Sequence, residues 1–271
     1  MENNIFEELA VLEITKDESG CRLSATGKKV ITETFLKIIL NGMELITISC
    51  LNQQQEELVI GFLYNEGIID SLQDVKNISF NDKIPAVSVE LKEGIVPGNQ
   101  YSTNSITSSG GRYHINPPAQ NQYEALTSKI TFPLDGILDL MAAFITKSEI
   151  FATVGGVHSV LFYTPDCEIL TEDIGRHNCY DKMTGILLKS AKKYLSGRGI
   201  VFASGRISSE IMAKIIRIGI PVVVSKSTPT AAAVKLAREH NVTIMGYVRN
   251  TGGFIYSCPE RLLVSRLCNS N

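Results

Sequence analysis

The chain has 271 residues, of which 44% are hydrophobic, and a formal net charge of -2 at pH 7. This is enough for one large or two modest domains with buried cores. The near-neutral charge gives no electrostatic case for nucleic-acid binding, and RNA-binding aromatics, zinc-finger spacing and a basic stripe are missing. No apolar run is long enough to span a bilayer, and the polar start is unlike a secretory signal. We therefore expect a cytoplasmic protein with neither nucleic acid nor membrane as a partner.

The first half of the chain predicts a β-rich region with one helix. Alternating apolar and polar residues around Asn41-Gly42 predict a hairpin with a two-residue turn. Helical spacing over residues 53–64 ends just before Gly67, a residue typical of helix ends. The predicted strands cover residues 30–40, 43–50, 75–80 and 86–91.

A polar stretch over residues 94–122 separates the two halves. It contains Ser108-Ser109-Gly110-Gly111 and Pro117-Pro118, and it is too long for an ordinary connector. We predict that it is functional or mobile and that a domain boundary lies near its end. The expected domains are a small α+β domain over residues 1–120 and a larger domain over residues 121–271.

The second half alternates between helical and strand patterns. The predicted helices cover residues 133–147, 176–193, 208–218 and 230–240. The predicted strands cover residues 150–154, 159–163, 168–171, 199–203, 221–225 and 242–248. This alternation predicts an α/β domain with a largely parallel sheet that is covered on both faces.

One segment, residues 171–182, gathers acids, an arginine, a histidine and an Asp-Lys pair around Gly175. Such dense charge beside an apolar run costs desolvation energy unless something polar is bound there. The amides of a helix start, with Arg176 and His177, suit a phosphate or another anion. Asp181, one helical turn after His177, could orient its ring. The alternative is a capped helix start whose charges pair with each other.

Four polar corners follow predicted strands, where ligands bind in open α/β sheets. They cover residues 155–158, 173–181, 204–208 and 225–230. The last two share a small polar turn, a cation and a hydroxyl residue that can cap the next helix. Together the corners predict a polyanionic or nucleotide-like ligand, although the P-loop, Rossmann and nucleophile-elbow motifs are absent. Residues 247–253 could add a phosphate contact or form a surface hairpin.

The cysteines carry no C-x-x-C or metal-ligand spacing, so we predict free thiols and no metal site. They are Cys21, Cys50, Cys167, Cys179, Cys258 and Cys268. Cys179 lies in the charged segment, where Arg176 and a helix start would lower its pKa. We treat it as a candidate reactive thiol, unless its side chain points into the core.

These corners together resemble the formate dehydrogenase accessory protein family FdhD, a set of sulfur carriers. The resemblance is carried by Glu172-Asp173-Ile174-Gly175-Arg176-His177-Asn178 with Asp181-Lys182, and by the segments at residues 61–69, 155–158, 204–210, 227–230, 246–249 and 259–261. It implies that the second domain is a three-layer α/β domain similar to the cytidine deaminase fold. It also implies a homodimer. Deaminase chemistry is not expected, because the H-x-E and P-C-x-x-C zinc pattern is missing.

The resemblance also implies a cargo, the molybdenum cofactor with two guanine dinucleotides, for which GDP would be a mimic. Family members accept sulfur as a persulfide from a cysteine desulfurase and pass it to this cofactor before insertion into formate dehydrogenase. The residues expected to bind the cofactor lie in the corners. They are His158, Arg176, His177, Ser204, Arg206, Ser225, Lys226, Thr228, Tyr247, Val248, Arg249, Asn250, Thr251 and Gly252.

One loop departs from the family pattern. Sulfur-carrying members have C-G-x-C-G after Thr-Ser-Ser, where this chain has Gly110 and Tyr113 at the cysteine positions. Neither residue can hold a persulfide, which requires a nucleophilic sulfur. Three explanations stay open: a cofactor-binding homologue that has lost sulfur transfer, transfer through Cys179, or a thiol supplied by a partner.

Overall fold

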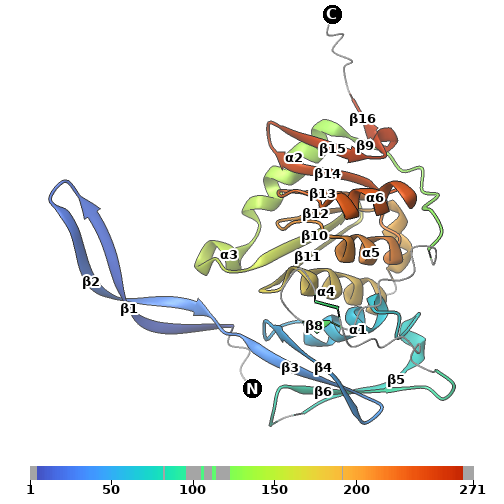
Figure 1. Ribbon diagram of the computed structural model, residues 1–271, viewed down its shortest axis with the longest axis horizontal. Helices are drawn as coiled ribbons and strands as arrows, with labels where there is room; N and C mark the ends of the chain where they lie inside the picture. Colours follow the sequence, from blue (N-terminus) through green and yellow to red (C-terminus); the bar gives the residue numbers. More distant parts are fainter. Residues whose placement is uncertain are drawn as a thin grey trace, which may run out of the picture.

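The computed structural model describes residues 5–81, 83–95, 105–106, 112–113, 123–190 and 192–264. Its largest sheet has six strands in the order β11-β10-β12-β13-β14-β15 (Figure 1). Their bounds are β10 His158–Thr164, β11 Cys167–Asp173, β12 Ile200–Ala203, β13 Val222–Ser225, β14 Thr243–Arg249 and β15 Gly252–Ser257. Strands β12, β13 and β14 are parallel, whereas β10 runs antiparallel to both of its neighbours and β15 runs antiparallel to β14. The prediction of a largely parallel sheet therefore holds only for the pairings of β12, β13 and β14, whereas the other three of the five pairings are antiparallel.

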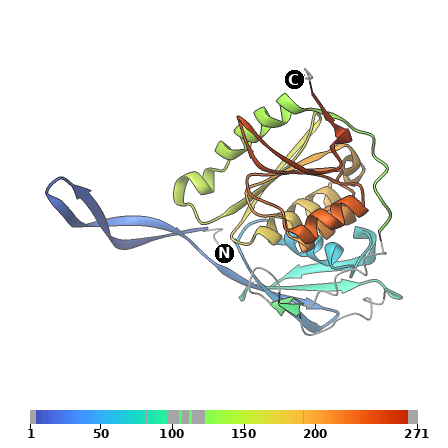
Figure 2. The same cartoon turned by 45° about the horizontal axis from the view of Figure 1, so that its top comes forward.

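Helices cover both faces of this sheet, as Figure 2 shows. Alternation along β12 sends Ile200 and Phe202 toward α2 (Leu134–Thr146), and Val201 and Ala203 into the core on the other face. That other face is covered by α4 (Arg176–Lys189), α5 (Ser209–Ile218) and α6 (Ala231–Glu239). The predicted layered α/β fold is confirmed, and its likeness to cytidine deaminases stays a prediction.

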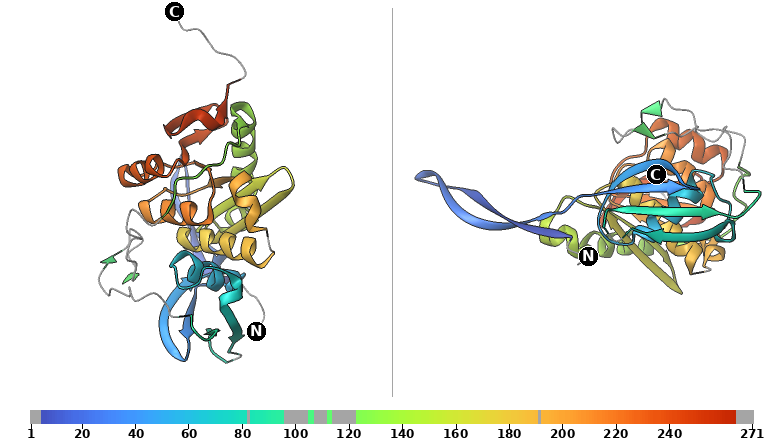
Figure 3. Two further views of the ribbon diagram at one scale, coloured as in Figure 1. Left: turned by 90° about the vertical axis from the view of Figure 1, so that its right-hand side faces the viewer. Right: turned by 90° about the horizontal axis from the view of Figure 1, so that it is seen from below.

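A second sheet of four strands, in the order β4-β3-β6-β5, lies at the far end of the molecule (Figure 3). The predicted hairpin joins β3 (Thr34–Leu40) to β4 (Met43–Cys50) through Asn41 and Gly42, whose φ angles of 48° and 81° are left-handed. The other two strands are β5 (Val75–Phe80) and β6 (Ala86–Leu91). Helix α1 (Gln55–Asn65) packs between this sheet and α4 in one continuous core.

The crossing of α1 and α4 depends on two glycines. A Cβ at Gly61 would lie 1.7 Å from the carbonyl oxygen of Asp181. A Cβ at Gly185 would lie 2.0 Å from the carbonyl oxygen of Glu57. The two backbones therefore touch directly, which a residue with a side chain would prevent at either position.

Two features differ from the sequence predictions. Residues 150–154 form part of helix α3 (Glu149–Val154), where a strand was predicted. Ser148 starts this helix by accepting a hydrogen bond from the backbone N–H of Phe151 at 2.9 Å, and Gly155 ends it with φ of 70°. The other feature is a long hairpin of β1 (Phe6–Asp17) and β2 (Gly20–Ile31), which projects from the body and was not predicted (Figure 1).

The remaining elements are short. They are β7 Ser105–Ile106, β8 Arg112–Tyr113, β9 Phe132–Pro133, β16 Leu262–Leu263, and 3-10 turns at Leu72–Asp74, Lys193–Arg198 and Pro259–Arg261. Most of the polar stretch at 94–122 lies outside the described residues, so the domain boundary near residue 120 stays a prediction. In the described part of the chain, no helix combines the length and hydropathy needed to cross a membrane.

Candidate functional site

The predicted corners lie at one edge of the six-stranded sheet. His158, the first residue of β10, pairs in register with Asp173, the last residue of β11. Because β10 runs antiparallel to its neighbours, its start reaches the same edge as the carboxyl ends of β11 and β12. The sheet topology thus brings the polar corners at residues 155–158, 173–181 and 204–208 to the same edge. The corner at 155–158 comes before its strand, whereas the other two follow theirs.

Gly205 brings the side chains of these corners close together. A Cβ on Gly205 would lie 3.2 Å from His158 Nδ1 and 3.7 Å from Arg176 Cβ, so the bare backbone lies beside both residues. Ser204 Oγ accepts a hydrogen bond from the backbone N–H of Ser159 at 3.0 Å and lies 3.5 Å from His158 Nδ1. We define His158, Arg176, His177, Ser204 and Arg206 as the inner cluster.

The inner cluster concentrates positive charge. Burial, followed by the charge of Arg206, lowers the pKa of Arg176. Burial and then Arg176 lower the pKa of His158. Burial and then Lys214 lower the pKa of His177 to about 3, so both imidazoles are neutral at pH 7. Two arginine charges beside neutral rings favour an anionic ligand.

A second set of predicted residues lies at the carboxyl ends of β13 and β14, along the same edge. Ser225 Oγ donates to the carbonyl of Gly205 at 2.8 Å, which joins this set to the inner cluster. Arg249 Nη1 donates to the carbonyl of Lys226 at 2.6 Å, and the hydroxyl of Thr228 donates to the carbonyl of Pro229 at 3.1 Å. The structure places Lys226 at the end of the neighbouring strand, and its contribution to a site shared with Arg176 stays a prediction.

Residues 247–252 cover the end of β14, the turn at residues 250–251 and the start of β15, which agrees with the surface-hairpin alternative. Tyr247 has a left-handed φ of 53° and is half exposed, whereas Val248 is fully buried in the core. Any contact of Val248 with a ligand would therefore use its backbone. Asn250 and Thr251 form the turn, and Gly252 is the first residue of β15 and pairs with Arg249.

The predicted helix caps of the two corner turns are confirmed. Ser208 accepts from the backbone N–H of Ile211 at 3.4 Å, and Thr230 accepts from that of Ala233 at 3.2 Å. These bonds fix the turns that carry Arg206 and Thr228 relative to the sheet.

The expectation of a lowered pKa at Cys179 is wrong. Its side chain is fully buried, and its thiol donates to the carbonyl of His158 at 3.3 Å. Burial, followed by the charge of Asp173, raises the pKa of Cys179 well above its ordinary value. Burial outweighs the opposing charge of Lys182, so Cys179 is a thiol of the core. Gly110 lies outside the described residues, and Tyr113 is described only as part of β8.

Much of the charged segment at 171–182 is internally paired. Asp173 and Lys182 form an ion pair at 2.7 Å, and both side chains are 0% exposed. Asp173 also accepts hydrogen bonds from Gly175 N, Asn178 Nδ2 and Leu51 N. For these residues the alternative of a self-paired helix start is correct, whereas Arg176 and His177 belong to the inner cluster.

The predicted role of Asp181 in orienting His177 is wrong. Both carboxylate oxygens of Asp181 accept from Lys214 Nζ at 2.7 Å, and one also accepts from Asn65 at 2.7 Å. His177 Nε2 instead lies 3.4 Å from Glu210 Oε2. Sequence analysis did not predict Lys214 as the partner of Asp181 or Glu210 as the neighbour of His177. The position of Glu210, in the first helical turn after the Ser-Gly-Arg corner, could have indicated its role.

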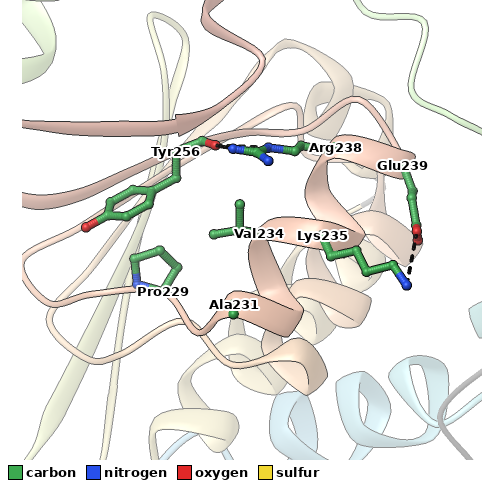
Figure 4. Close-up of a pocket in the computed structure, with 7 residues that line it drawn as sticks. All are labelled: Pro229, Ala231, Val234, Lys235, Arg238, Glu239 and Tyr256. Carbon is green, nitrogen blue, oxygen red and sulfur yellow. Dashed lines mark hydrogen bonds and ion pairs between the residues drawn. The ribbon is translucent and has the colours of Figure 1, made fainter.

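A hollow of about 550 Å³ lies between α6 and β15, close to the second set (Figure 4). It is lined by Pro229, Ala231, Val234, Lys235, Arg238, Glu239 and Tyr256. Both of its cations have partners: Arg238 donates to the carbonyl of Tyr256 at 2.9 Å, and Lys235 lies 3.9 Å from Glu239. None of the predicted cofactor-binding residues lines it. Across the described ranges, no group of three or more His, Cys, Asp or Glu could hold a metal ion.

The fold and the inner cluster define a layered α/β protein with a cationic site at one sheet edge. The chain belongs to the FdhD/NarQ family, whose model matches residues 31–263. It is 35% identical over 263 residues to the sulfur carrier protein FdhD of Staphylococcus aureus strain MRSA252, covering 93% of this chain and 96% of that protein. Its identity to the sulfur carrier protein FdhD of Bacillus subtilis strain 168 is 35% over 257 residues, with 93% and 97% covered.

The fold is also that of a crystal structure of a candidate formate dehydrogenase accessory protein from Desulfotalea psychrophila. The TM-score is 0.74 at 23% identity, and the similarity covers 94% of this chain and 99% of that one. At this identity the likeness establishes the fold alone.

Proposed function

We propose that this chain acts in the maturation of formate dehydrogenase by binding a molybdenum cofactor with guanine dinucleotides as its cargo. The observation that carries this proposal is the close approach of Arg176 to the corner that carries Arg206: a Cβ on Gly205, the residue before Arg206, would lie 3.7 Å from Arg176 Cβ. Glu210 supplies one negative charge against these two arginines. A diphosphate complements such a site, because arginine forms charge-assisted, bidentate hydrogen bonds with phosphate oxygens.

Membership of a family with named sulfur carriers supports a part in sulfur transfer. In that reaction a cysteine desulfurase would supply a persulfide; its S–S bond would break, the carrier thiolate would leave, and the terminal sulfur would reach the sulfide level with two electrons from the reduced cofactor. A carrier of this kind needs an accessible cysteine at the site. Among the described residues, Cys50, Cys167 and Cys179 are buried, exposed Cys21 lies in the β1–β2 hairpin, and half-buried Cys258 follows β15 at the opposite end of the sheet. The family's cysteine positions hold Gly110 and Tyr113.

These observations favour a second candidate function, a homologue that binds the cofactor or a guanine nucleotide and does not carry sulfur itself. Under this proposal a thiol of a partner, either the desulfurase or the dehydrogenase, would bring sulfur to the bound cofactor. The family resemblance further supports a homodimer.

We expect Arg206→Gln to weaken GDP binding by roughly 10- to 100-fold, the loss that follows removal of a charged hydrogen bond. Isothermal titration calorimetry with GDP, GMP and guanosine should show tighter binding with each added phosphate. Arg238→Gln is the matched control, because Arg238 is engaged with the carbonyl of Tyr256 outside the inner cluster. Unchanged GDP affinity in Arg206→Gln would contradict the proposed site, and equal stabilisation by GDP and the complete cofactor would favour a simple nucleotide-binding protein.

Incubation with a cysteine desulfurase and ³⁵S-cysteine should leave no persulfide label on Cys179, because burial keeps this residue a protonated thiol. The measurement is non-reducing electrophoresis with autoradiography, and Cys179→Ser is the control. Label that appears on the wild-type chain and disappears in Cys179→Ser would show that Cys179 does carry sulfur.

A further inference from the structure

The β1–β2 hairpin, which we call the arm, projects from the body (Figures 1 and 2 and the right view of Figure 3). Along nearly its whole length its residues are exposed. A two-stranded ribbon of this kind is marginally stable at best in water by itself, so a projecting arm points to a partner surface that covers it.

The two faces of the arm differ in chemistry. Strand register places side chains of directly opposed residues on the same face. One face carries the pairs Ala10–Gly27, Leu12–Ala25 and Ile14–Leu23. On this face Leu12, Ile14 and Leu23 are 64%, 72% and 65% exposed, an unusual concentration of large apolar side chains. The opposite face carries the pairs Val11–Thr26, Glu13–Ser24 and Thr15–Arg22 and is mostly polar.

The apolar face is complementary to itself. Along β1 it presents, in order, Glu8, Ala10, Leu12, Ile14 and Lys16. If two arms lie antiparallel about a two-fold axis at Leu12, each Glu8 faces the other copy's Lys16. The large pair Ile14–Leu23 then faces the small pair Ala10–Gly27, and small residues opposite large ones allow two sheets to interdigitate.

The small pair is covered in the single chain by a movable side chain. A Cβ on Gly27 would lie 2.5 Å from Glu8 Oε1, so the carboxylate of Glu8 lies over this glycine. The Glu8 side chain is exposed and can turn toward an opposing lysine, which would open the space above Gly27. When the Glu8 side chain turns toward Lys16 of the other copy, it would form the ion pair and also uncover Gly27 for the large side chains of that copy.

We propose that the arm binds the arm of a second copy of this chain, apolar face to apolar face and antiparallel. Such an interface is isologous, because the same surface serves both subunits. The arm's nearly balanced charge argues against nucleic acid or an anionic membrane as its partner. Its acids are Glu7, Glu8, Glu13, Asp17 and Glu18, and its bases are Lys16, Arg22, Lys28 and Lys29. The interface goes beyond cofactor binding and gives the expected homodimer a specific geometry.

This arrangement would bring the second chain next to the sheet-edge site. The base of the arm packs on the corner at 155–158, since a Cβ on Gly156 would lie 3.5 Å from Ile31 Cδ1. Ile5, Phe6 and Ile31 join a small core with Ile150 and Val157. Twelve strand residues span roughly 40 Å, so antiparallel arms place the tip of one copy near the base of the other.

The first test is the association state of the full chain by sedimentation equilibrium. We expect a wild-type dimer and at least a roughly 100-fold weaker dimer in Leu12→Lys/Ile14→Lys, because lysines would be buried between the arms. The control Glu13→Lys/Thr15→Lys introduces two lysines on the polar face instead and should leave the dimer intact. A monomeric wild type, or a dimer equally strong in Leu12→Lys/Ile14→Lys, would overturn the proposal.

The second test fixes the geometry with a short bis-maleimide. In Lys29→Cys the new thiol lies eight residues from Cys21 on the same strand, roughly 27 Å away, which the reagent cannot span within one chain. In the antiparallel pair these positions face each other, so covalent dimers are expected in a background with Cys258 and Cys268 replaced by serine. Lys28→Cys, on the other face, should give none, and equal cross-linking of both variants would contradict the proposed face.

GDP titration of the same arm variants separates this proposal from the proposed function. Arm variants that become monomeric and still bind GDP would support the interface independently of the cofactor site. Conversely, Arg206→Gln should lose GDP affinity and remain a dimer.

Discussion

Replacing Gly61 with alanine is expected to destabilise the protein by about 3 kcal/mol or more. Alanine has the higher helix propensity and would by itself add about 0.5–1 kcal/mol of stability. Against this, its Cβ would lie 1.7 Å from the carbonyl oxygen of Asp181. That neighbour is backbone of a buried helix and cannot rotate away, so α1 and α4 must separate and lose their packing along the whole crossing.

Urea denaturation followed by circular dichroism would measure this loss. The matched control is Gly136→Ala in α2, where the new Cβ would lie 4.0 Å from Pro133 Cβ, an ordinary contact. That variant should be as stable as the wild type or slightly more so. If Gly61→Ala unfolds at the same urea concentration as Gly136→Ala, the close helix crossing does not determine stability.

The helix crossing also affects the site. Helix α4 begins at Arg176 and His177 and continues to the glycine that touches α1. Separation of the two helices would therefore displace the start of α4, where two residues of the inner cluster lie. We expect Gly61→Ala to bind GDP more weakly even under conditions in which it remains folded.

Local sequence patterns predicted the elements whose determinants are local. The Asn41-Gly42 turn, the end of α1 before Gly67 and the caps at Ser208 and Thr230 each depend on a few neighbouring residues. Helix α3 was mistaken for a strand because its Ile-Phe-Ala-Thr-Val sequence is rich in strand-forming residues. The capping bond of Ser148 overrides this preference.

Distant partners could not be read from local spacing. Asp181 seemed placed to orient His177 at one helical turn, yet it pairs with Lys214, which is 33 residues away, and with Asn65, which is 116 residues away. The reversal of β10, which brings His158 to the shared sheet edge, is likewise a property of topology. Sequence analysis proposed the residues of the candidate site, whereas the fold decides which of their charges are paired internally and which stay at the sheet edge.

The buried ion pair of Lys182 with Asp173 is one of the internally paired charges, and we expect its removal to have the second large effect on stability. Replacing Lys182 with methionine is expected to cost about 3–5 kcal/mol, the usual result of removing one partner of a buried ion pair. Its Nζ lies 2.7 Å from Asp173 and also donates to the carbonyl of Glu172 at 2.9 Å. Without Lys182, the carboxylate of Asp173 keeps its three N–H donors and loses its counter-charge in a fully buried position.

Two further variants test the cause of that loss by urea denaturation. Lys76→Met removes an exposed pair with Glu90 at 3.4 Å and should change stability by less than ~1 kcal/mol. Lys182→Met/Asp173→Asn should regain part of the stability lost in Lys182→Met, because a neutral amide needs no counter-charge and can still accept hydrogen bonds. If the double variant is less stable than Lys182→Met, the cost arises from lost packing of the lysine stem. Because Asp173 pairs in register with His158, recovery of stability without recovery of GDP binding would show that the ion pair also positions the inner cluster.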